Sequence, residues 1–253
     1  MEYKRLIPVI IPLVIWTIGQ MFLRLPSLFY CALAIGVLII VLGVRLLAGK
    51  GKHDWPLLAI APVIFFLVFS CYLAIIIGNF WIQALLILIA WFLFNYFRNL
   101  YYYLTHKELE IIYENKLDNL LIASSFLTVF AAATTLFSLP EFINWPIWAT
   151  ILIIAAVIFL LFVQFKALKK IKSGSAQALA VIGVLCLAEL AWGLSLLPLK
   201  FHLLGLFLAI AYYLILFIIR LHLRGALNRR VLRVPLILSA VAFIVLFLTA
   251  RWL

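Results

Sequence analysis

The chain has 253 residues, of which 69% are hydrophobic and only 11% are charged, and its formal net charge is +12. A soluble domain of this length cannot bury so much apolar surface, so lipid is its expected solvent. The cations lie between apolar runs of about 18 to 22 residues and form no continuous basic face, which argues against nucleic-acid binding.

Apolar runs bounded by proline, glycine, asparagine or charge predict an all-α polytopic bundle of nine transmembrane helices. In chain order the expected spans are residues 6–23, 28–48, 57–77, 80–97, 120–139, 147–165, 176–197, 203–221 and 236–251. No stretch is left for a separate soluble core. Residues 1–253 are therefore expected to form a single integral membrane domain.

Lysine and arginine alternate between the two sides of the expected membrane. Connections on the side of the N-terminus, counted with the adjoining ends of the spans, hold 17 of the 20 cations, and those on the other side hold 3. Because basic loops remain in the cytoplasm, this asymmetry predicts a cytoplasmic N-terminus and an external C-terminus.

The same arrangement indicates four tandem helical hairpins followed by one final helix. Three of the expected external turns contain Leu-Pro, at Leu25-Pro26, Leu139-Pro140 and Leu197-Pro198, and the remaining turn contains Gly78-Asn79. Tandem hairpins in one orientation would be parallel repeats. Alternatively, Leu-Pro recurs only because it ends helices well.

One connection, residues 98–119, is long enough to contain structure of its own. Thr105 and Glu108 match a capping box that could begin a short helix before the fifth span. The mixed charge and the tyrosines of this segment are typical of a helix at the membrane surface. Such a helix would be either a docking site or a plain connector.

Glu189 is the one acidic residue inside an expected span. A carboxyl group at that depth is costly unless it is protonated, paired with a cation or in contact with water. Aligning the hairpins on their turns places Gln20 and Thr134 at the level of Trp192, so these polar groups could form a pocket with Glu189. The functional interpretation is a proton, ion or substrate contact, and the structural one is hydrogen bonding between helices.

A basic segment precedes the last expected span and includes Arg224, Arg229, Arg230 and Arg233. It could bind anionic lipid head groups or an acidic partner. Its role in orienting the chain explains it equally well.

The sequence shows no pattern of residues that would form a catalytic, metal or cofactor site. The four histidines are scattered over four connections, and no GxSxG, HExxH or P-loop motif occurs. Each of the three cysteines falls in a different span, without a CxxC pair.

The last third of the chain contains Glu189-x-x-Trp192, Leu197-Pro198, Tyr212-Tyr213 and a basic segment up to Arg233. With these residues it resembles a family of uncharacterised bacterial multi-pass membrane proteins of unknown function. The resemblance implies a bacterial inner-membrane location and no particular activity.

These observations favour a non-enzymatic scaffold or subunit of a membrane assembly, in contact with lipid, with other membrane proteins or with further copies of itself. One alternative is a transporter or permease component for a small or lipid-like solute that uses Glu189. A second alternative is an intramembrane lipid-modifying enzyme.

Overall fold

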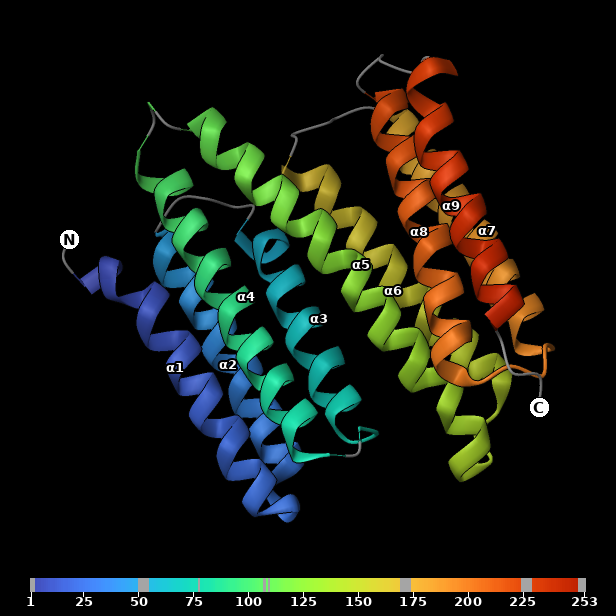
Figure 1. Ribbon diagram of the computed structural model, residues 1–253. Helices are drawn as coiled ribbons and strands as arrows, with labels where there is room; N and C mark the ends of the chain where they lie inside the picture. The colour runs from blue at the N-terminus through green and yellow to red at the C-terminus, as the bar shows by residue number, and fades with distance from the viewer. Residues whose placement is uncertain are drawn as a thin grey trace. The chain divides into compact units, whose positions relative to one another are not determined.

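A computed structural model of the protein describes residues 3–49, 55–76, 78–106, 108, 110–168, 174–223 and 229–249. These residues form nine α-helices and one short 3-10 helix, η1, and contain no strand (Figure 1). In chain order they are α1 (Tyr3–Arg24), η1 (Pro26–Leu28), α2 (Phe29–Ala48), α3 (Trp55–Leu73), α4 (Asn79–Thr105), α5 (Glu110–Ile143), α6 (Ile147–Leu168), α7 (Gly174–Ser195), α8 (Phe201–Leu223) and α9 (Arg229–Thr249).

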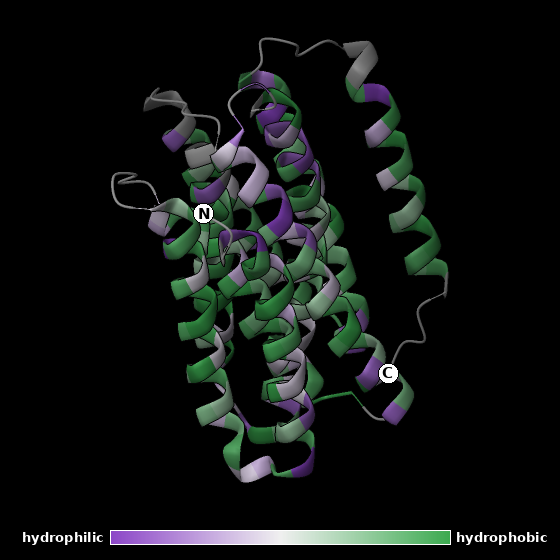
Figure 2. Cartoon of the chain, turned by 90° about the vertical axis from the view of Figure 1, so that its left-hand side faces the viewer, coloured by the Kyte–Doolittle hydropathy of each residue, from purple (hydrophilic) through white to green (hydrophobic). Residues whose placement is uncertain are grey.

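The expected class, an all-α bundle of membrane-spanning helices, is confirmed. Within the described residues, α1 to α8 are each long and apolar enough to cross a bilayer, and α9 contributes the shorter apolar stretch Leu232–Leu248. Hydrophobic residues run along most of the length of the helices (Figure 2). A helix suits this environment because it satisfies its own backbone hydrogen bonds where water is absent.

The turn signals in the sequence are only partly confirmed. Pro26 begins η1 directly after α1, and Pro198 lies in the connection between α7 and α8. Gly78, with a φ of 114°, precedes the first residue of α4. The expectation for Leu139-Pro140 is wrong, because Pro140 lies inside α5 and the helix continues to Ile143.

The long connection also differs from the expectation. Residues 98–105 continue α4, and residues 110–119 belong to α5, a single helix of 34 residues, so the described residues of this connection form no separate α-helix. Both segments lack glycine and proline, so nothing ends a helix where hydropathy falls. The apolar runs marked the part of each helix that suits lipid, not the full helix.

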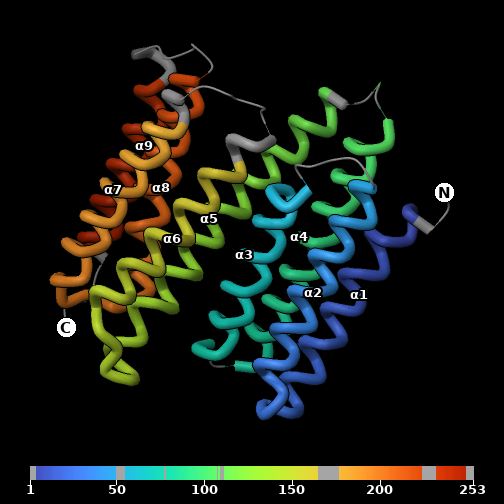
Figure 3. The backbone as a smooth tube through the Cα atoms, turned by 180° about the vertical axis from the view of Figure 1, so that it is seen from behind, coloured from blue at the N-terminus to red at the C-terminus, as the bar shows by residue number. Residues whose placement is uncertain are grey.

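The chain divides into two compact units, unit 1 (Met1–Ser125) and unit 2 (Phe126–Leu253), and the boundary falls within α5. The single membrane domain stays a prediction. In unit 1, α1 contacts α2 and α4, and α3 contacts the same two helices (Figures 1 and 3). Stacked rings fill the centre, with Phe65 and Phe92 centroids 4.0 Å apart.

Unit 2 is a second helical bundle. α7 packs against both α6 and α8, and α9 packs against α8, where the rings of Phe207 and Phe243 stack 5.4 Å apart. α5 contacts α6 through a hydrogen bond from Thr150 Oγ1 to the Leu136 carbonyl, and contacts α8 at Gly205. Each of the four expected hairpins is therefore a pair of contacting helices, with α9 as the additional one.

Candidate functional site

Helix α7 has one face that packs inside unit 2. The buried residues of this face are Gly183, Leu187, Ala191 and Leu194, which recur at helical spacing. A Cβ atom on Gly183 would lie 3.1 Å from Ile215 Cγ2 on α8 and 3.4 Å from Phe162 Cε2 on α6. This glycine lets α7 approach both of its neighbours closely.

The opposite face of α7 is exposed and carries Glu189. Its residues follow one another at alternating intervals of four and three: Ala178, Ile182, Leu185, Glu189 and Trp192, and Leu196 continues the row in the turn directly after the helix. We call these six residues the outer α7 stripe. Trp192 is 53% exposed, and no hydrogen bond or ion pair of the Glu189 carboxyl occurs among the described residues.

The depth of Glu189 makes this exposure significant. It precedes Ser195, the last residue of α7, by six positions, or about 9 Å along the axis, and follows Gly174 by about 22 Å. A polar acid within the span that contacts lipid directly costs a few kcal/mol. Direct contact between lipid and the outer α7 stripe is therefore unfavourable at Glu189.

Thr134, which the sequence grouped with Glu189 and Trp192, lies inside unit 2 instead. Its side chain is fully buried on α5, and its Oγ1 has no hydrogen-bond partner among the described residues. A Cβ atom on Gly205 of α8 would lie 2.9 Å from the Thr134 backbone nitrogen and 3.1 Å from the Phe130 carbonyl oxygen. Thr134 thus marks a place where the backbones of α5 and α8 touch.

Gln20 has a partner that the sequence did not reveal. Its Nε2 donates to Gln83 Oε1 at 2.6 Å, and Gln83 Nε2 donates back to Gln20 Oε1 at 3.2 Å. The pair joins α1 to α4 within unit 1. The sequence is consistent with the pair through equal depth, since Gln20 lies four positions before the last residue of α1 and Gln83 lies four positions after the first residue of α4.

The structure therefore brings Glu189 and Trp192 together on one face and gives Thr134 and Gln20 separate surroundings. Other hydroxyl groups on the first helices of the hairpins mostly donate within their own helix. Examples are Thr17 to Val14, Ser125 to Ile122, Thr135 to Ala131 and Ser195 to Trp192. Such bonds satisfy the hydroxyl locally and connect no helices.

Asp118 is a buried acid that the sequence placed in a connection. It lies on α5 within unit 1 with 3% of its surface exposed, beside the fully buried Leu117. Asp118 belongs to α5 because this helix begins before the apolar run of residues 120–139. Hydropathy alone does not show that the helix begins there.

The basic segment is described in part. Arg224 lies outside the described residues, α9 begins with Arg229 and Arg230, and Arg233 is exposed. Exposure of Arg233 leaves its guanidinium available to anions.

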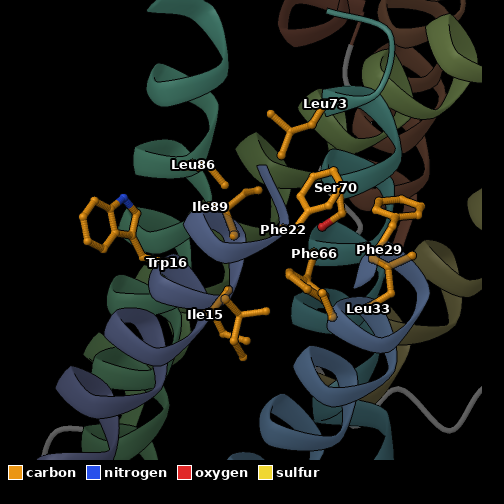
Figure 4. Close-up of a pocket in the computed structure, with 13 residues that line it drawn as sticks. Ile15, Trp16, Phe22, Phe29, Leu33, Phe66, Ser70, Leu73, Leu86 and Ile89 are labelled. Carbon is orange, nitrogen blue, oxygen red and sulfur yellow. The ribbon is translucent and has the colours of Figure 1, made fainter. Parts of the chain in front are cut away.

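Unit 1 contains an apolar cavity lined by residues of α1, α2, α3 and α4, shown in Figure 4. It is a slot of about 20 Å³, lined by side chains that include Ile15, Leu33, Phe66 and Ile89, and Ser70 provides its hydroxyl group. An open bowl of about 430 Å³ adjoins it near the α1–α2 turn and is lined by Phe22, Leu23, Pro26, Phe29, Tyr30 and Ala74. Phe22 and Phe29 line both spaces, and their ring centroids are 4.9 Å apart.

The described part of the chain has no cluster of metal ligands. No three His, Cys, Asp or Glu side chains there lie close enough together to hold a metal ion. Cys31, Cys71 and Cys186 are free thiols.

Comparison with known proteins adds one match. A family model described as a protein of unknown function (DUF5656) matches residues 49–249, from the end of α2 to the end of α9. No curated protein and no solved structure matches the chain. The match agrees with the expected resemblance to an uncharacterised family and extends it well beyond the last third of the chain.

Proposed function

The chain belongs to the DUF5656 family of proteins of unknown function, and from its own residues we propose that it is a non-enzymatic subunit of a membrane assembly. The surface that joins it to the assembly is the outer α7 stripe. This helix lies within the residues that the family model matches.

One observation carries the proposal, namely the exposure of Glu189 on a membrane-spanning helix. Because Glu189 faces away from α6 and α8, these helices neither shield its carboxyl group from lipid nor provide it with a hydrogen bond. A second transmembrane helix laid along the stripe would remove the carboxyl group from lipid and provide a hydrogen-bond partner. The apolar residues above and below Glu189 would supply packing area.

The proposed location is a bacterial inner membrane, with the N-terminus in the cytoplasm. The distribution of cations, 17 against 3, supports this orientation. In that orientation Arg233 and the rest of the basic segment lie at the cytoplasmic surface, where anionic lipid head groups are the expected contacts.

The test is purification of the tagged chain in native lipid patches, followed by native mass spectrometry. Copies or other membrane proteins should remain bound to the wild type and to Leu190→Ala, which alters an exposed residue outside the stripe. Glu189→Leu should lose them while keeping its thermal stability, because Glu189 supports no contact inside unit 2. A chain that purifies alone as a monomer would contradict the proposal.

A second candidate function, handling of a lipid-like solute, is favoured by the slot and bowl of unit 1. Both are lined almost entirely by apolar side chains, which suit a hydrocarbon chain. The measurement is binding or flux of a fluorescent lipid in reconstituted vesicles. Ala74→Trp, which fills the bowl, should abolish the signal, and Ala84→Trp, on an exposed part of α4, should not.

A further inference from the structure

The outer α7 stripe has the geometry of a helix that packs along another helix. Its alternating intervals of four and three place five residues of α7, followed by Leu196, on one seam of a left-handed helix pair. Within unit 2 this seam lies opposite Gly183, Leu187, Ala191 and Leu194, so it plays no part in contacts with α6 and α8.

Two small residues lie beside the seam and leave space for the backbone of a neighbouring helix. Cys186 is exposed, and a Cβ atom on Gly193 would meet nothing within 4 Å. They are seven positions apart, so they lie on the same edge of the seam. Unlike Gly183, Gly193 is not required by any packing inside unit 2, and it allows a second backbone to come near.

A second copy of this chain fits this surface by symmetry. Two copies inserted in the same orientation are related by a two-fold axis along the membrane normal, so α7 meets α7 in parallel and each seam residue meets its own copy at the same depth. Glu189 then faces Glu189. A protonated carboxyl has one O–H donor and free acceptor positions, so two of them can hydrogen-bond reciprocally.

We propose that the outer α7 stripe binds a second copy of this chain, through a parallel α7–α7 contact in which the two Glu189 side chains hydrogen-bond to each other. This inference rests on the proposed function, because it identifies which molecule covers the stripe. A cation is not needed at the contact, and the sequence has no lysine or arginine at the depth of Glu189 in another span. Trp192 on each side adds apolar area one turn away.

The test is disulfide crosslinking in native membranes. The starting variant replaces Cys31, Cys71 and Cys186 by serine, and single cysteines are then introduced by Leu185→Cys in the seam or by Leu190→Cys beside it. Both positions are exposed, at 58% and 38%. Mild oxidation should give a dimer band for Leu185→Cys and at least about tenfold less for Leu190→Cys, since only seam residues meet across the axis. Equal crosslinking at both positions indicates random collision and overturns the proposal.

The role of the acid is tested in the Leu185→Cys chain. Glu189→Gln should retain the dimer, because two amides also pair reciprocally, whereas Glu189→Leu should lower the crosslinked fraction about tenfold. A dimer that is unaffected by Glu189→Leu overturns the proposed pairing.

A photoreactive maleimide on the same cysteine separates failure of this inference from failure of the proposed function. An adduct with twice the mass of the chain supports the second copy. An adduct with a different protein overturns the second copy and leaves the assembly role intact. The absence of any protein adduct overturns both.

Discussion

The hydroxyl of Tyr96 on α4 donates a hydrogen bond to the backbone carbonyl of Leu58 on α3. Leu58 precedes Pro62 by four residues, and proline has no N–H to complete the helical hydrogen bond at that carbonyl. Tyr96 and Leu58 are both buried. The phenol therefore replaces the missing backbone donor and joins α4 to α3.

Tyr96→Phe should lower the free energy of unfolding by about 1–2 kcal/mol, because it leaves a buried carbonyl without a donor. In a Pro62→Ala background the helix supplies its own N–H to Leu58, so the cost of Tyr96→Phe should fall clearly below its cost in the wild type. Reversible unfolding in mixed detergent micelles measures both values.

The control is Tyr101→Phe, which removes the hydroxyl group of another largely buried tyrosine of α4. Among the described residues, the Tyr101 hydroxyl makes no hydrogen bond. It should change stability by less than about 0.5 kcal/mol. Equal costs for Tyr96→Phe with and without Pro62 would show that the proline does not create the need for the phenol.

The same relationship recurs in unit 2. Pro140 leaves the Leu136 carbonyl without its helical donor, and Thr150 Oγ1 of α6 donates to that carbonyl at 3.4 Å. The bond is long, so Thr150→Val should cost only about 0.5–1 kcal/mol of unfolding free energy. Thr150→Ser keeps the hydroxyl and should cost less in the same unfolding assay. A serine variant as unstable as the valine variant would assign the cost to lost packing.

Gly205 is the residue at which α8 touches the backbone of α5. Gly205→Ala places a methyl group 2.9 Å from a backbone atom of Thr134, so the helices must separate, and we expect a loss of about 1–3 kcal/mol in unfolding free energy. Gly193→Ala is the matched control, because its methyl group meets nothing within 4 Å and should leave the stability of the monomer unchanged or slightly higher. Similar losses for both variants would mean that the close contact is not the cause.

The number of helices and their order could be predicted because each membrane span must be a long apolar run, which is a local property of sequence. Helix ends were less predictable. α5 begins ten residues before its expected span, because hydropathy reports the thickness of the hydrocarbon layer and residues 110–119 contain no glycine or proline that would stop a helix.

Contacts between helices could not be predicted for a different reason. Gln20 with Gln83 and Gly205 with Thr134 depend on how each helix is rotated about its axis and where it crosses its neighbour. In nearly uniformly apolar helices the sequence carries little rotational information. The polar groups were correctly recognised as unusual, but their depth alone did not reveal which of them meet.

The amide pair between α1 and α4 can be tested by a double-mutant cycle. Gln20→Leu or Gln83→Leu alone leaves one amide without its partner, so each should cost about 1 kcal/mol of unfolding free energy. The double variant should be more stable than the sum of the two single losses implies, because both amides are then gone. Additive losses would indicate that each glutamine interacts elsewhere.

Labelling with an impermeant thiol reagent tests the proposed orientation. Asn79 is the first residue of α4, Glu108 lies three residues after its last residue, and both are exposed. In a background without the three native cysteines, Asn79→Cys should react in intact cells, and Glu108→Cys should react only after the membrane is permeabilised. The cations predict this result, because the connection that holds Glu108 belongs to the basic set, whereas the turn at Asn79 has none. The reverse pattern would place the N-terminus outside, and reaction at both positions in intact cells would show that α4 does not cross the membrane.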